Sequence, residues 1–328
     1  MASAARTTIK FLTYNVWSRE HVAVYRRIRA ISELIEQHDP DVIFLQEVTE
    51  YIHTLFQEAP WWAHYKTFSS NDKKQGDSWF YTSKVPQQTE YACLLLSKLA
   101  VEEVVYHAPP SPPYHPRSPQ LSPRSPSPVR DAFHTRLAVA GPLPPDLLSN
   151  WVYRPRCPEE KESRNHYFWE PATWRQVRAA TCCLPGQTPS DVRSMHRRGR
   201  AGLFLEHFDV NGCRNVVLGG DLSWDDDVDG PLPLGNGWVD AWSELQGGEG
   251  PGGWTYDAVA NPMLRGCKPE RKRPDRFVCK LMDFRLESIE VVGVEPISDV
   301  THCDDDGNEL PVLPSHHFGL LLTITSLE

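Results

Sequence analysis

The sequence has no long apolar run. No stretch of the 328 residues approaches the roughly 20 apolar residues that cross a membrane, and residues 1–10 lack the apolar core of a secretory signal peptide. The eight cysteines form no CxxC pair and show no spacing typical of zinc sites or disulfide frameworks. We therefore expect reduced thiols in a protein of the nucleus or the cytoplasm, without a membrane partner.

The sequence also lacks an excess of positive charge. Lys and Arg number 34 against 43 Asp and Glu, which gives a net charge of -9 at pH 7. A surface that attracts polyanions over its whole extent is therefore not expected. Basic residues gather locally, above all in residues 268–276, so any nucleic acid would be held by such loops. Hydrophobic residues make up 40% of the chain, enough for the core of one large α/β domain.

Regular structure is interrupted in the middle of the chain. Residues 109–128 contain nine prolines among twenty residues, interleaved with Ser and Arg. Proline lacks the amide proton that helices and sheet ladders need, so we expect an extended or disordered linker. A ligand for proline-recognising domains is the alternative. Residues 101–179 show no clear period apart from a helical fragment around 132–140. We interpret them as a disordered insertion, either diverged or translated from non-coding sequence.

Outside this region, short apolar runs rich in β-branched and aromatic residues predict strands. These runs are residues 9–17, 41–48, 91–98, 178–184, 215–222, 277–281, 288–294 and 320–325. Apolar residues at helical spacing from Val24 to Ile35 predict an amphipathic helix between the first two strands, and residues 194–208 predict a second helix. The order strand, helix, strand brings the ends of the first two strands to one edge of a sheet.

Polar side chains stand where several of these strands begin or end. Asn15 and Glu47 end the first two strands, Asp221 follows two glycines at the end of 215–222, and Asp275 and His317 each precede a strand. Each one alone is as well explained by a turn cap, a structural amide or a solvated rim residue. A carboxylate at the end of a buried strand is costly unless it is hydrogen-bonded, paired or metal-bound. Together, these residues predict one metal-dependent site.

The motifs around these residues resemble those of the endonuclease/exonuclease/phosphatase superfamily of metal-dependent phosphodiesterases. They are T-Y-N-V-W (13–17), L-Q-E-V (45–48), G-G-D-L-S-W (219–224), P-D-R-F (274–277) and P-S-H-H-F-G-L (314–320). Within the superfamily, the run G-D-L-S-W-D-D-D-V-D-G-P-L-P-L and the segments G-W-T-Y-D and K-R-P-D-R-F-V-C-K are similar to the type 2 tyrosyl-DNA phosphodiesterases of plants. The resemblance covers about 8–98 and 193–327.

The resemblance implies a fold and an activity. The fold is a four-layer α/β sandwich of two packed mixed sheets flanked by helices, over residues 9–328 after an N-terminal tail at 1–8. The activity is Mg²⁺- or Mn²⁺-dependent hydrolysis of the 5′-phosphotyrosyl bond in DNA, during double-strand-break repair in the nucleus. The partner would be the single-stranded end of a DNA that carries the adduct.

The resemblance also implies roles for individual residues. Glu47 would bind the metal, and Asp221 would orient or deprotonate the attacking water with help from Ser223. His317 would hydrogen-bond the phosphoryl oxygen, with its imidazole oriented by Asp275.

The remaining roles concern the metal, the phosphate and the DNA. Asn15 would help to position the metal or the phosphate. Trp254 and Arg276 would hold the 5′ end of the DNA strand.

Three positions depart from the family pattern. Ser223 stands where the family has an asparagine, His316 replaces a carboxylate near the metal, and Cys183 replaces a second phosphate-binding histidine. We therefore expect an imidazole at the metal and a thiol at the substrate. Two alternatives stay open: a catalytically dead relative that binds DNA or protein, and a phosphodiesterase for another phosphate ester.

Overall fold

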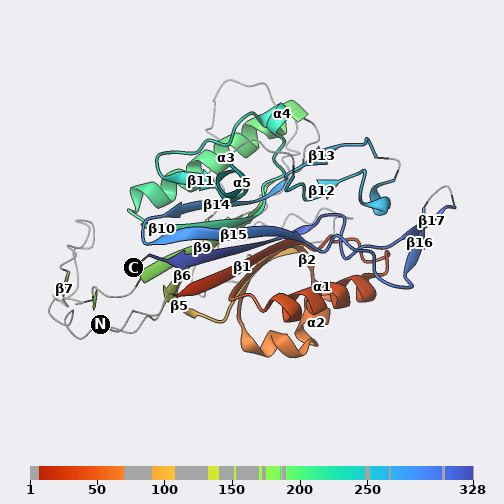
Figure 1. Cartoon of the computed structure of the whole chain (residues 1–328), viewed down its shortest axis with the longest axis horizontal. Helices are drawn as coiled ribbons and strands as arrows, with labels where there is room; N and C mark the ends of the chain where they lie inside the picture. The colour runs from red at the N-terminus through yellow and green to blue at the C-terminus, as the bar shows by residue number, and fades with distance from the viewer. Residues whose placement is uncertain are drawn as a thin grey trace, which may run out of the picture.

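Two six-stranded mixed sheets lie face to face in the computed structural model, and helices cover their outer faces (Figure 1). The residues that the structure describes are 7–69, 91–107, 132–139, 151–152, 170–171, 175–184, 186, 190–247, 252–265, 267–304 and 307–327. This arrangement is the four-layer α/β sandwich expected from the sequence. No helix within these residues is both long and apolar enough to cross a membrane.

The first sheet has the strand order β15-β18-β1-β2-β4-β3. Its strands are β1 (Thr8–Asn15), β2 (Val42–Thr49), β3 (Lys66–Ser69), β4 (Tyr91–Ser97), β15 (Phe284–Val292) and β18 (Gly319–Ser326). The parallel pair β1 and β2 is joined by α1 (Val24–His38), and β18 pairs with β1 in the antiparallel direction. The predicted strand-helix-strand unit is confirmed, and it places the ends of β1 and β2 side by side.

The second sheet has the order β11-β14-β10-β9-β6-β5. Its strands are β5 (Ala100–His107), β6 (Ala132–Val139), β9 (Arg175–Cys183), β10 (Asn215–Asp221), β11 (Trp238–Asp240) and β14 (Asp275–Leu281). The parallel pair β9 and β10 is joined by α3 (Ser190–Val210), and β14 runs antiparallel beside β10. The registers place Asp221 opposite Asp275 on one side and opposite Cys183 on the other.

Smaller elements complete the described part of the chain. They are the helices α2 (Glu50–Gln57), α4 (Asp226–Asp229) and α5 (Ala241–Gln246) and the 3₁₀ turns Pro60–His64 and Pro262–Leu264. Three two-stranded sheets pair β12 (Tyr256–Asp257) with β13 (Arg271–Lys272), β16 (Thr301–Cys303) with β17 (Glu309–Pro311), and β7 (Trp151–Val152) with β8 (Glu170–Pro171).

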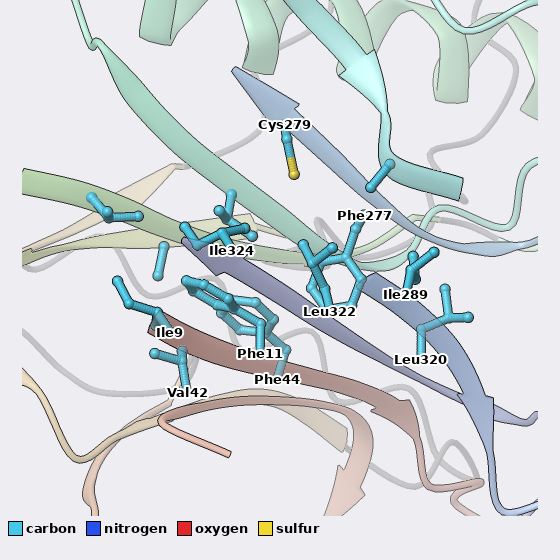
Figure 2. Close-up of a cluster of buried hydrophobic side chains, with 14 of the residues drawn as sticks. Ile9, Phe11, Val42, Phe44, Phe277, Cys279, Ile289, Leu320, Leu322 and Ile324 are labelled. Carbon is cyan, nitrogen blue, oxygen red and sulfur yellow. The ribbon is translucent and has the colours of Figure 1, made fainter. Parts of the chain in front are cut away.

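The alternation of side chains along the strands divides the core into layers. Ile9 and Phe11 of β1 face the second sheet; the Phe11 ring stacks on Phe44 of β2, and the Phe44 ring meets Phe277 of the second sheet (Figure 2). Leu12 and its neighbours on the other face of the first sheet pack under α1 and α2. A third cluster lies between the second sheet and α3. Both sheets are thus covered on two faces, which explains why their strands read as continuous apolar runs.

A polar bridge crosses the core between the sheets. The amide nitrogen of Gln46 donates to the hydroxyl oxygens of Thr13 in the first sheet and Thr181 in the second, each at 3.2 Å. All three side chains are fully buried. Buried polar groups that satisfy one another fix a single arrangement, because any slip of one sheet would leave them unpaired. The bridge therefore sets how the two sheets align just below the strand ends.

The prediction of a helical fragment around residues 132–140 is wrong, because Ala132–Val139 form strand β6. The strand pairs with β5 on one side and β9 on the other, and these two ladders outweigh a weak local preference for helix. Three strands of the second sheet thus lie within or overlap the region interpreted as an insertion. The proline-rich residues 109–128 lie outside the described residues, and their interpretation stays a prediction.

Two glycines let β10 pass close to its neighbours. A Cβ atom on Gly219 would lie 2.6 Å from ring carbons of both Phe44 and Phe277, and one on Gly220 would lie 2.3 Å from the carbonyl oxygen of Cys182. Real Cβ atoms do not approach other atoms so closely. The glycine pair is thus required by close packing directly before Asp221.

Gly220→Ala is expected to lower the free energy of unfolding by about 1–3 kcal/mol, since the backbone of β9 would have to move. Urea unfolding followed by circular dichroism measures this change. Gly202→Ala is the matched control: nothing lies within 4 Å of a Cβ there, and alanine should stabilise α3 by up to about 1 kcal/mol. Unchanged stability in Gly220→Ala would contradict the close approach.

Candidate active site

The polar residues predicted from the strand ends meet at one edge of the sandwich. Asn15 ends β1 and Glu47 lies near the end of β2, both in the first sheet, while Asp221 and Asp275 face each other across β10 and β14 in the second. His317 comes from the loop before β18. Hydrogen bonds link these residues in two groups. Asn15 binds Glu47 and Asp221, and His317 binds Asp275.

Asn15 joins the two sheets at this edge. Its fully buried amide nitrogen donates to Glu47 Oε1 at 3.1 Å and to Asp221 Oδ2 at 2.9 Å. Its amide oxygen accepts the backbone N–H of Trp17 at 3.0 Å, which fixes the orientation of the amide. One side chain thus holds two carboxylates from different sheets at hydrogen-bonding distance from a shared donor.

The Glu47 carboxylate is held from a second side by Ser18. The backbone N–H and the hydroxyl of Ser18 donate to Glu47 Oε2 at 3.0 and 2.9 Å. A carboxylate offers about four acceptor positions, and three donors leave room for one further ligand. Glu47, Trp17 and Ser223 have φ angles of 59°, 61° and 47°, a left-handed conformation that L-residues rarely adopt. Such strain concentrates where function requires a special geometry.

Asp221 is suited to accept a proton near neutral pH. Burial and the negative charge of Asp275 raise its pKa to about 6, against the opposing effects of His317 and the N–H of Ser223. That N–H donates to Asp221 Oδ1 at 2.7 Å. The Ser223 hydroxyl donates to the carbonyl oxygen of Leu184 at 3.0 Å and lies 3.4 Å from the same Asp221 oxygen.

His317 and Asp275 form a buried pair. His317 Nδ1 lies 2.7 Å from Asp275 Oδ2, which also accepts the hydroxyl of Thr255. Burial disfavours the charged imidazole, but the charge and hydrogen bond of Asp275, with Asp221 and Glu47 nearby, raise the pKa of His317 to about 9. The imidazole is therefore protonated at neutral pH, and Nε2 is a hydrogen-bond donor for an anionic ligand.

The donor set at this edge fits a hard divalent cation. Ligand atoms of Asp221, Asp275 and His317 lie within 4.8 Å of one another. Asp275 Oδ1 is buried and accepts no hydrogen bond from any described residue, although an orphaned carboxylate oxygen is costly. Glu47, Asp221 and Asp275 supply carboxylate oxygens, which Mg²⁺ and Mn²⁺ prefer. The residues present therefore fit a divalent cation, and its identity as Mg²⁺ or Mn²⁺ stays a prediction.

The two residues that replace family donors lie beside the cluster. His316 lies with its ring 5.2 Å from that of Trp17 and 4.3 Å from that of His317. Burial and the nearby cations, first of all His317, keep its pKa well below 6.5, so its imidazole is neutral. Cys183 is a buried thiol whose pKa is raised by its contact with Cys93 and by burial. Their predicted roles at the metal and the substrate stay predictions.

The two residues expected to hold DNA occupy different settings. Arg276 is 4% exposed, and its guanidinium forms ion pairs with Asp240 at 2.8 Å and Asp226 at 2.6 Å. Trp254 is half-buried, with the guanidinium of Arg271 4.9 Å from the centre of its ring. Neither belongs to the carboxylate and histidine cluster, and a direct contact with substrate stays a prediction for both.

Sequence reasoning missed two residues that orient the site. Ser18 supplies two donors to Glu47, and Thr255 supplies one to Asp275. Thr255 lies inside the segment G-W-T-Y-D, which carries part of the family resemblance. Ser18 directly follows the T-Y-N-V-W motif, and only its position next to that motif could have indicated a role.

Comparisons with known proteins bear on the family and the fold. A model of the Endonuclease/Exonuclease/phosphatase family matches residues 12–299. A comparison with curated protein sequences gives no match. Similar solved structures include D. rerio TDP2 complexed with single strand DNA product (16% identity, 97% of this chain and 99% of that chain, TM-score 0.62). They also include TDP2 from C. elegans (16% identity, 98% and 75%, TM-score 0.62) and the human Nocturnin catalytic domain with bound sulfate anion (16% identity, 99% and 97%, TM-score 0.58). At these identities the likeness shows a common fold.

Asp275→Asn should lower the pKa of His317 from about 9 to its ordinary value of about 6.5 or below, because burial then acts without the partner charge. Since the folded-state pKa is raised, the pair stabilises the fold most below about pH 6.5, and this stability is lost as pH rises through about 9. NMR titration of the His317 ring in metal-free protein measures the change. Asp283→Asn, which alters a carboxylate paired with Arg214, should leave His317 unchanged. A His317 pKa near 9 in Asp275→Asn would contradict the pairing.

Proposed function

The chain belongs to the endonuclease/exonuclease/phosphatase family, and we propose that it is a Mg²⁺- or Mn²⁺-dependent phosphodiesterase that hydrolyses 5′-phosphotyrosyl bonds in DNA. The observation that carries the proposal is the joint arrangement of two units. Asn15 bridges the carboxylates of Glu47 and Asp221, and next to them lies the His317–Asp275 pair. A phosphodiester needs both charge neutralisation and a proton acceptor, and this edge of the sandwich offers both.

The cation would be held by carboxylate oxygens. Glu47 has one acceptor position left after Asn15 and Ser18, and Asp275 Oδ1 accepts nothing from the described residues. A bound Mg²⁺ or Mn²⁺ supplies Lewis-acid stabilisation of negative charge on the phosphoryl and leaving oxygens.

The side chains of the chain itself account for the proton chemistry. Asp221, with a pKa of about 6, is ionised at neutral pH and basic enough to take a proton from a water molecule aligned with the phosphorus. Asn15 and the N–H of Ser223 fix its carboxylate in one orientation. His317, with a pKa of about 9, donates a hydrogen bond to a phosphoryl oxygen as charge develops, and Asp275 holds its ring.

Three observations support DNA as the substrate. The D. rerio TDP2 structure, which shares the fold, holds a single-stranded DNA product. Arg271 of β13, which pairs with Asp257, lies over the ring of Trp254 just before β12, and an aromatic ring with a guanidinium is the pair of groups that holds single strands by stacking and charge. Tyr256 lies edge-on to the His317 ring at 5.7 Å, so this aromatic rim adjoins the catalytic residues. A role in DNA repair, and with it a nuclear location, follows from this substrate.

A binding protein without turnover is the second candidate. Ser223 directs its hydroxyl to Leu184, and Cys183 places a neutral thiol where the family has a histidine. Each lost transition-state donor costs on the order of 10²–10³ in rate, although such losses need not multiply. The next experiment separates the two candidates.

Purified protein should release tyrosine from a 5′-tyrosyl oligonucleotide only when Mg²⁺ or Mn²⁺ is present. Asp221→Asn should lower kcat by about 10²–10⁴, because asparagine cannot accept the proton. Asp227→Asn, an exposed position six residues further on, is the matched control and should retain the wild-type rate. Equal residual signals from wild type and Asp221→Asn would reject catalysis by Asp221 and favour the binding protein.

The rate should depend on pH through both catalytic groups. Since Asp221 must be deprotonated and His317 protonated, kcat/KM should rise as pH passes about 6 and fall as it passes about 9. In Asp275→Asn the alkaline limb should move to lower pH, because His317 loses the charge that raises its pKa. Initial rates between pH 5 and 10 measure the profile. An alkaline limb that stays in place would remove His317 from the mechanism.

A further inference from the structure

The guanidinium of Arg27 is fully buried, although Arg26 and Arg29 on the same helix face solvent. Backbone carbonyl oxygens from two loops accept its N–H groups. The acceptors are Val22 for Nε (2.8 Å), Val16 and Pro314 for Nη1 (2.9 and 3.5 Å), and Arg19 and Trp17 for Nη2 (2.6 and 3.3 Å). Five carbonyls thus match the five N–H groups of a guanidinium.

Burying a guanidinium costs free energy, because the cation loses its hydration. No ion pair among the described residues includes Arg27, so backbone carbonyl dipoles replace its hydration. Burial lowers its pKa to about 10, which leaves it charged at neutral pH. Its guanidinium also lies 4.9 Å from the centre of the Trp17 ring. The side chain therefore acts as a rigid, charged centre around which backbone is ordered.

The backbone that Arg27 orders is the support of the catalytic edge. The first loop follows β1 and includes two strained residues, Trp17 and Ala23, with φ of 61° and 39°. Its Ser18 donates twice to Glu47.

The second loop continues from Pro314 into Ser315. The hydroxyl of Ser315 donates to the carbonyl of Asn15 at 2.7 Å and accepts the N–H of His317 at 3.2 Å. Arg27 thus connects the two loops that hold Glu47 and His317.

We propose that Arg27 is a positioning residue for the divalent cation, which acts by holding the Ser18 donors against Glu47 Oε2. The inference rests on the proposed function in one respect, namely that Glu47 is a ligand of the cation. With Oε2 occupied by Ser18 and Oε1 by Asn15, the carboxylate keeps one orientation before the cation arrives. Such preorganisation raises affinity, since less freedom is lost on binding.

Arg27→Lys keeps the charge but offers three N–H groups on a single nitrogen, so at least two of the five carbonyls lose their donor. The dissociation constant for Mn²⁺, measured by electron paramagnetic resonance well below the melting temperature, should rise about 10–100-fold. Arg29→Lys, an exposed change on the same helix, is the control and should leave it unchanged. Unchanged Mn²⁺ affinity in folded Arg27→Lys would overturn the proposal.

A double variant separates positioning from a general loss of stability. Ser18→Ala removes the hydroxyl donor to Glu47 without touching Arg27, and it should also weaken Mn²⁺ binding. If Arg27 acts through Ser18, the double variant should bind Mn²⁺ about as weakly as the weaker single variant. Fold-changes that simply multiply would overturn the proposed route. So would unchanged affinity in Ser18→Ala, which remains informative even where Arg27→Lys fails to fold.

A metal-free measurement distinguishes this inference from the proposed function. Hydrogen exchange of the Ser18 amide reports its hydrogen bond to Glu47, and Arg27→Lys should accelerate it while Arg29→Lys does not. If both exchange and Mn²⁺ affinity respond but wild type cleaves no 5′-tyrosyl DNA, the proposed substrate fails and the inference stands. If wild type cleaves and neither quantity responds, the inference is overturned and the function stands.

Discussion

The rest of the site depends on the two hydrogen bonds that the Asn15 amide donates to Glu47 and Asp221. Glu47 and Asp221 belong to different sheets, and their like charges would drive the sheet edges apart in a buried setting. A neutral group with two N–H bonds can hold both carboxylates, and its oxygen still receives the N–H of Trp17. An aspartate there would add a third charge, and an alanine would remove the donor that the two carboxylates share. The core between the sheets and the Gln46 bridge serve to bring this amide into place.

Much of this arrangement could be predicted from the sequence, because each functional residue ends or precedes an unmistakable strand. Glu47 and Asp221 are each ambiguous alone, and it is the recurrence of polar residues at several strand ends that identifies them. Strand β6 could not be predicted, since its eight residues depend on ladders with β5 and β9 that no local pattern encodes.

Arg276 illustrates a different limit of sequence-based prediction. Its ion-pair partners Asp240 and Asp226 are 36 and 50 residues away in the chain. A residue that the sequence presents as a free phosphate ligand therefore already has its charge neutralised.

The site contains several features that lower the stability of the fold. Three residues with left-handed backbone, an orphaned oxygen on Asp275 and a buried guanidinium all lie at or beneath the same edge. The body of the sandwich is built from amphipathic helices packed on apolar sheet faces. Strain that persists in one place must be held by its surroundings, and the two sheets with their shared aromatic core supply that support. Stability and chemistry are thus divided between the body of the sandwich and one edge.

The position of β18 in the first sheet affects how the protein folds during its synthesis. This strand lies between β15 and β1 in the first sheet, and the loop before it brings Ser315 to Asn15, a residue 300 positions earlier. During synthesis on the ribosome, β1 emerges long before β18 is made. The edge of β1 that pairs with β18 therefore stays without its partner strand until then. Contacts of such high sequence separation fold slowly and expose strands to misassociation. Because Ser315 and His317 lie in the loop before β18, the candidate active site is assembled only after β18 has docked beside β1.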